Sequence, residues 1–134
     1  LNCLSADVPR SLPIRSLAKG GFSGIKEARQ EVIRDPVAWE KLWKQHSASA
    51  SSAEKIPAVD FASEIVVAAT MGTKRTGGYT IEIIRVEPAE KSLKIFVKQT
   101  SPPPGALTIQ ALTAPFHFVA VPKSDLKPEF VEAK

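Results

Sequence analysis

The chain has 134 residues, of which 43% are hydrophobic and 24% are charged, and its formal net charge is +4 at pH 7. This length predicts a single domain, and this composition excludes a fully disordered chain. Basic residues alternate with acidic ones, as at Lys26-Glu27 and Glu40-Lys41, which argues against the dense basic stripe of a nucleic-acid-binding protein.

Residues 1–13 contain Pro9 and Pro13, and we interpret them as an extended leader that precedes a domain of residues 14–134. Because the chain begins at Leu1, we expect that an upstream piece has been removed. Cys3 is the single cysteine, so an internal disulfide or a cysteine-rich zinc site cannot form. It is either the acylated cysteine of a lipoprotein or an unpaired thiol; we favour the thiol, because Asn2 is not the small residue usual at that position.

No apolar run approaches the ~18 residues that cross a bilayer.

A glycine-rich turn at residues 19–24 leads into a predicted strand at residues 25–34, which is rich in β-branched side chains. A helix is predicted at residues 36–47, because Asp35 can cap its first amides and Pro36 is tolerated at the first helical position. One face of this helix carries an apolar stripe made of Trp39, Leu42, Trp43 and His46. The i, i+3, i+4, i+7 spacing predicts that the helix packs on the core, with His46 as a packed histidine rather than a metal ligand.

The rest of the chain predicts strands. Residues 65–70 form a short unbroken apolar run, typical of a strand covered on both faces. Residues 79–84 and 93–98 alternate apolar with polar side chains, and residues 107–112 and 116–121 give two more strands after the stiff connector at 102–105. The tail after Pro122 is polar and is predicted to end in a weak helical turn. The fold class is therefore α+β, a mainly antiparallel sheet, incomplete barrel or sandwich, with one packed amphipathic helix.

The turn at residues 71–78 has unusual backbone requirements. Gly77 and Gly78 can adopt positive φ at little cost, and we predict a tight hairpin between the strands on either side. Lys74, Arg75 and Thr76 would then lie at an exposed tip. Such a tip either binds a partner or keeps a sheet edge soluble.

No catalytic or metal-binding motif is present in the sequence, so we predict no catalytic residue, no metal and no cofactor. His117 lies between Phe116 and Phe118 in a predicted strand, points away from both, and is expected to be exposed or to contact a partner. Asp60 is expected to cap a turn, with a catalytic base as the alternative. Trp39 and Trp43 are expected in the core, with stacking on a ligand as the alternative.

Four elements carry a resemblance to a known family: Trp39-x-x-Leu42-Trp43-x-x-His46, Val59-Asp60-Phe61, Gly72-x-Lys74-x-Thr76-Gly77-Gly78-Tyr79 and Pro115-Phe116-His117-Phe118-Val119. Over about residues 20–122 the chain resembles the PrcB C-terminal domain family, named for a subunit of a protease complex. The resemblance implies an exported bacterial domain, located in the periplasm, in the envelope or outside the cell. It also implies a domain without enzymatic activity of its own that accompanies a secreted protease.

The leading hypothesis is therefore a non-catalytic binding module that stabilises or regulates a secreted or envelope protease. Its candidate partner-binding residues are Lys74, Arg75, Thr76 and Tyr79, and its structural motif residues are Trp39, Trp43, Asp60, Gly77 and Gly78. One alternative is a small-molecule or glycan binder that uses the two tryptophans and Tyr79. The other is a hydrolase built on His117 and Asp60. No nucleic-acid partner is expected, and the sequence does not predict an oligomeric state.

Overall fold

A computed structural model describes residues 12–47 and 56–133. Its elements in chain order are β1 (Arg15–Gly20), β2 (Ala28–Ile33), α2 (Pro36–His46), β3 (Glu64–Met71), β4 (Thr80–Pro88), β5 (Ser92–Thr100), β6 (Phe116–Pro122) and β7 (Lys127–Ala133). Cys3 and most of the predicted leader lie outside the described residues. Leu12, near the end of that leader, donates its N–H to the Val86 carbonyl of β4 at 2.7 Å; the boundary between leader and domain stays a prediction.

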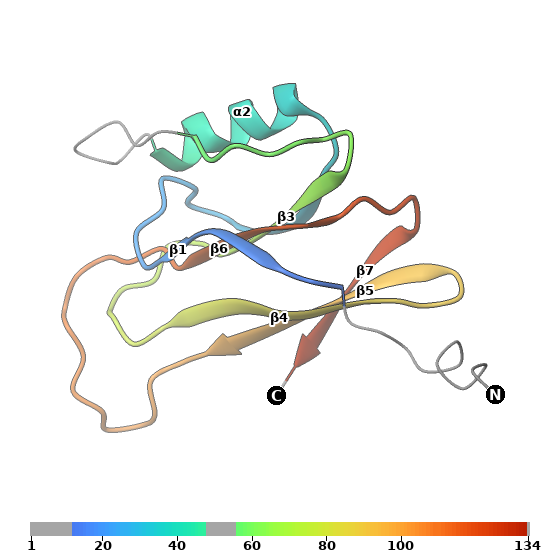
Figure 1. Cartoon of the computed structure of the whole chain (residues 1–134). Helices are drawn as coiled ribbons and strands as arrows, with labels where there is room; N and C mark the ends of the chain where they lie inside the picture. Colours follow the sequence, from blue (N-terminus) through green and yellow to red (C-terminus); the bar gives the residue numbers. More distant parts are fainter. Residues whose placement is uncertain (1–11, 48–55, 134) are drawn as a thin grey trace.

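The strands form two sheets. One has four antiparallel strands in the order β1-β6-β3-β2, and the other has three strands in the order β4-β5-β7, with β7 parallel to β5. Figure 1 shows α2 above the four-stranded sheet and the three-stranded sheet below it. The predicted α+β class is thus confirmed, as an open two-sheet sandwich with one packed helix.

β3 lies in the middle layer and is buried on both faces, as its apolar run predicted. Ile65, Val67 and Ala69 point into the core between the two sheets. Val66 and Ala68 point to the other side, into the core under α2. A strand with a neighbouring layer on each face needs apolar residues at every position, which explains why its sequence does not alternate.

β4 and β5 supply the other wall of the core between the sheets, and here the alternation is clear. Leu93, Ile95 and Val97 are buried along β5, as predicted. In β4, Ile81 and Ile83 are buried and the register then shifts between Ile83 and Arg85. This bulge adds one residue, so that Val86 also faces the core.

The helix is formed and packed as predicted. The Asp35 carboxylate accepts a hydrogen bond from the Ala38 N–H at 2.8 Å and caps the first turn. Trp39 and Trp43 are only 3% and 5% exposed, and Trp39 stands edge-on to Phe118 with the ring centroids 5.9 Å apart. Because both indoles are enclosed by the core, neither can stack on an external ligand.

Three predictions about elements are wrong. Residues 72–79 do not form a hairpin, because β3 and β4 belong to different sheets and the segment crosses from one to the other. Residues 107–112 form no strand. The polar tail contains a strand, β7, instead of a helical turn: its Phe130 packs against the core between the sheets, and the Arg34 guanidinium donates to the carbonyls of Ser124 and Leu126 just before it.

Candidate partner-binding face

Two long connections leave the sandwich at the same end. Residues 72–79 join β3 to β4, and residues 101–115 join β5 to β6. Thr70 pairs with Phe116 in one sheet and Thr80 pairs with Thr100 in the other, so all four strand ends lie together. We call the surface made by these connectors, with the adjoining residues 21–26, the loop face.

Hydrogen bonds hold the two connectors to each other. Lys74 and Thr113 exchange backbone hydrogen bonds of 2.7 and 2.9 Å, and the Gly77 N–H donates to the Ile109 carbonyl at 3.0 Å. The Thr113 hydroxyl donates to the Thr76 carbonyl at 2.8 Å. The first connector is therefore covered by the second, and of the three predicted tip residues only Arg75 is exposed, whereas Lys74 and Thr76 are half-buried.

The two glycines serve this packing in different ways. Gly78 has φ +92°, which confirms the prediction that at least one of them adopts positive φ, and a Cβ there would lie 2.9 Å from Pro102 Cβ. Gly77 does not have positive φ. A Cβ on Gly77 would lie 2.6 Å from the Ile109 side chain, so this glycine is needed for the close approach of the connectors.

The loop face exposes apolar side chains. Leu107 is 102% exposed, and Ile109 and Leu112 are 59% and 68% exposed. Phe22 joins them, because the Ala114 N–H donates to the Gly21 carbonyl and holds residues 21–23 against the second connector. Together these side chains are four of the seven large apolar ones that are exposed in the described part of the chain. A hollow of about 390 Å³ between Phe22 and Leu112 also includes Lys26 and Thr73 in its lining.

The charge of the loop face is positive. Lys26, Lys74 and Arg75 are its charged residues, and no acidic residue occurs in segments 21–26, 72–79 or 101–115. The Lys74 ammonium lies 5.3 Å from the centre of the Tyr79 ring, a cation–π distance that orients this side chain along the surface. The four candidate partner-binding residues are thus grouped on one face; their role in binding stays a prediction.

Both connectors and the strands that carry them fall within residues 65–122, the stretch that matches the family model described as PrcB C-terminal. Residues 65–122 are therefore similar to the PrcB C-terminal family. The match contains the Gly72–Tyr79 and Pro115–Val119 motifs, whereas the tryptophan helix and Val59-Asp60-Phe61 lie before it. It covers somewhat less than half of the 134-residue chain. The PrcB-like family is protease-associated. Searches of curated proteins and of solved structures gave no match to the chain.

Within the PrcB C-terminal segment, His117 does not lie where the sequence predicted. It points away from Phe116 and Phe118 as expected, but it is 4% exposed instead of accessible. Its Nδ1 accepts the Ile83 N–H at 2.9 Å, and its Nε2 lies 3.1 Å from the Ser16 hydroxyl. Burial, with a smaller contribution from the nearby Lys19 ammonium, lowers the pKa of His117 to about 4. The imidazole is therefore neutral at pH 7 and joins the two sheets.

The expectation failed because β6 was not recognised as an inner strand. It pairs with β1 on one side and β3 on the other, and the second sheet covers the face to which His117 points. The continuous apolar run of residues 118–121 is the signal that would have indicated a strand buried on both faces.

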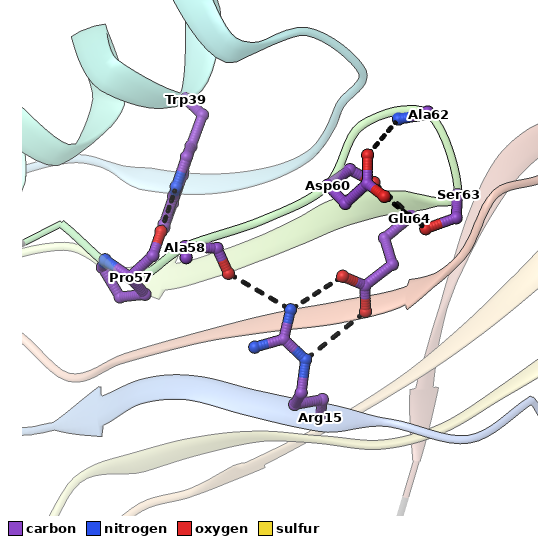
Figure 2. A network of polar contacts seen from close by, with 8 residues as sticks. All are labelled: Arg15, Trp39, Pro57, Ala58, Asp60, Ala62, Ser63 and Glu64. Atoms are coloured by element: carbon purple, nitrogen blue, oxygen red, sulfur yellow. Dashed lines mark hydrogen bonds and ion pairs between the residues drawn. The ribbon is translucent and has the colours of Figure 1, made fainter.

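Asp60, which precedes the PrcB C-terminal segment, caps a turn as expected. Its Oδ1 accepts the Ala62 N–H at 3.0 Å and its Oδ2 lies 3.3 Å from the Ser63 hydroxyl (Figure 2). The same view shows the Arg15 guanidinium between the Glu64 carboxylate, at 2.8 Å, and the Ala58 carbonyl, at 3.3 Å. These contacts fix the entry of the chain into β3.

The structure does not bring the proposed hydrolytic pair together. Asp60 lies in the turn before β3, which begins at Glu64. His117 pairs with Ala69, about 17 Å along β3 from Glu64, so the two side chains lie at different places along the strand. The described residues contain no cluster of three side chains that could hold a metal ion. Residues 12–47 and 56–133 also contain no helix long and apolar enough to cross a membrane.

Proposed function

We propose that this chain is a non-catalytic binding domain of the bacterial envelope or its exterior, which stabilises or regulates a secreted or envelope protease through the loop face. The observation that carries the proposal is the group of uncovered apolar side chains beside cationic ones on this face, and both connectors of the face lie inside the PrcB C-terminal segment. The protease association of the family supports a protease as the class of partner.

The chemistry of the loop face suits a protein partner. The buried centre of a protein–protein interface is depleted of charged residues other than arginine and enriched in aromatic side chains, and a polar rim surrounds it. Leu107, Ile109, Leu112 and Phe22 provide the apolar part, and Arg75 lies on the neighbouring connector. Each Å² of apolar surface that a partner covers contributes roughly 25 cal/mol before the costs of association.

The loop face is also organised before binding. Backbone hydrogen bonds between Lys74 and Thr113, and between Gly77 and Ile109, hold the two connectors in one arrangement. Little further ordering is then required when a partner arrives, which reduces the entropic cost of association.

The glycan-binding and hydrolase alternatives lose their basis. Trp39 and Trp43 are enclosed, and Tyr79 is half-buried with the Lys74 ammonium 5.3 Å from the centre of its ring. His117 and Asp60 each satisfy hydrogen bonds of the fold and lie far apart. The first finding removes the aromatic platform proposed for a glycan, and the second removes the proposed catalytic pair.

The proposal is tested by photo-crosslinking in the native host. A photoreactive residue replaces Leu107 in the full-length protein, and a matched control replaces Val37, which is 75% exposed on α2. We expect mass spectrometry to identify an envelope or secreted protease crosslinked from position 107 and not from position 37. Absence of any protease from the position 107 products, or equal capture from both positions, would contradict the proposal.

A further inference from the structure

We propose that residues 107–112 form an open edge to which the partner adds a β-strand, and that this strand alternates apolar with acidic residues. The inference deepens the proposed function and rests on it, because it specifies how the loop face recognises its partner.

The backbone of this segment is unpaired. In the described part of the chain, no backbone N–H from residue 107 to residue 112 donates to a protein acceptor. Of its carbonyls, that of Ile109 is the one that accepts a protein hydrogen bond, from Gly77. A row of free donors and acceptors on an extended chain is a template for pairing with another strand.

The side chains also favour a strand. Leu107 and Ile109 alternate with Thr108 and Gln110, a period of two with β-branched residues at its centre. Residues 106–110 contain no turn or bend, and the chain bends at residue 111. The sequence predicted a strand here, and what the structure lacks is a neighbour along its outer edge.

The free edge faces outward. Because the Ile109 carbonyl points to Gly77, alternation directs the backbone groups of Thr108 and Gln110 away from the first connector. Figure 1 shows residues 101–115 as the outermost chain at this end of the molecule, with residues 72–79 on their inner side. A partner strand can therefore approach residues 108 and 110 without moving any element of the fold.

The neighbouring side chains specify the partner's chemistry. Leu107 and Ile109 are uncovered, so apolar residues opposite them would form cross-strand pairs. Lys74 and Arg75 lie on the adjacent connector, and neither connector contains an acidic residue. Acidic residues on the partner strand would therefore complement the charge of this surface. A second copy of this chain would bring another positive, acid-free surface to the same place, and this repulsion disfavours it as the occupant.

The test uses the full-length protein and two sets of capped octapeptides that alternate apolar residues with either Asp and Glu or Lys and Arg. Hydrogen exchange of the amides of residues 107–112 is measured with and without each set. We expect the acidic set to slow exchange there by about tenfold or more, and less so at high salt, with no effect of the basic set. No slowing with either set, or equal slowing with both, would overturn the proposal.

A pair of variants tests the backbone itself. Gln110→Pro removes an outward N–H, whereas the matched Gln110→Ala keeps it. Residue 110 donates no backbone hydrogen bond within the described fold, so both variants should melt at the same temperature. We expect the proline variant alone to lose binding of the acidic peptides, by about tenfold or more. Equal binding by the two variants would show that the edge is not used.

Sedimentation of the free protein tests whether a second copy of this chain occupies the open edge. A dimer that forms with rising concentration and protects residues 107–112 would make a second copy the occupant and overturn the acidic partner. Capture of a protease from position 107 without peptide binding would refute strand addition and leave the proposed function standing. Peptide binding without protease capture would support strand addition and contradict the proposed protease partner.

Discussion

His117 uses both nitrogens of one ring: Nδ1 joins the two sheets, and Nε2 contacts a neighbouring strand of the same sheet. Its Nδ1 accepts a backbone N–H from β4, and its Nε2 contacts the Ser16 hydroxyl on β1. The acceptor role of Nδ1 requires the neutral ring with its proton on Nε2. A histidine that the sequence offered as a surface or catalytic group is therefore part of the internal structure.

We predict that acidification weakens the fold through this ring. The folded-state pKa of about 4 is below the ~6.5 of an unfolded histidine, so stability is complete above pH ~6.5. As the pH falls from there toward 4, the unfolded chain takes up a proton that the folded chain does not. The free energy of unfolding should fall by roughly 1–3 kcal/mol across this range. Urea denaturation at several pH values measures it, and His117→Gln is the control. Parallel pH curves for the two proteins would contradict the prediction.

Truncation of Trp43 tests the packing of α2. The ring is 5% exposed and lies 5.5 Å from Trp39 and 6.3 Å from Phe118, centre to centre. Trp43→Ala should lower the free energy of unfolding by about 3–5 kcal/mol, because it leaves a cavity between helix and sheet. Trp43→Phe retains much of the volume and should cost less. Native fluorescence that is readily quenched from solution would argue against the buried position.

At the scale of elements, the two connectors depend on glycine where they approach each other. Gly78→Val should destabilise the fold by more than ~1 kcal/mol, because the residue would keep a positive φ and meet Pro102. Gly21→Ala is the matched control, since φ there is not positive and nothing lies within 4 Å of the added methyl group. Thermal melts compare the two variants. An unchanged melting temperature for Gly78→Val would show that glycine is not required at position 78.

Elements with a strong local pattern were predictable from the sequence. The α2 stripe, the apolar run of β3 and the alternation in β5 each indicate which faces of the element are buried. β1 and β7 were missed because they are mostly exposed edge strands with few apolar residues, and their pairing is decided by neighbours far away in the sequence. Residues 107–112 show the reverse case, in which a good strand pattern meets no adjacent strand.

The candidate site was predictable only in part. Lys74 and Arg75 were identified from the sequence, but as the tip of a hairpin. Two successive strands joined by a glycine turn have the same sequence pattern whether they pair or cross between sheets. The pairing of β3 with β6 decides the matter, and β6 lies far away in the sequence. The apolar half of the loop face was assigned to a strand, so its exposure could not be foreseen.

At the scale of the whole molecule, charge distribution should govern partner binding. Lys74→Ser with Arg75→Ser should weaken binding to the captured protease and reduce its salt dependence, because cations are removed from a face that has no acids. The melting temperature should change little. Lys123→Ser with Lys127→Ser removes equal charge near the other end of β6 and should leave binding unchanged. Equal effects of the two pairs would assign the loop-face cations to solubility.

The central position of β3 has a consequence for the time course of synthesis. Its neighbour β6 begins at Phe116, long after β3 ends at Met71, and translation takes roughly 2–9 s to cover that interval at bacterial rates. During those seconds β3 can already pair with β2 and pack against α2, but its other edge has no strand beside it. An apolar strand that ends in the middle layer of the finished protein thus has an unpaired edge while the chain is being made.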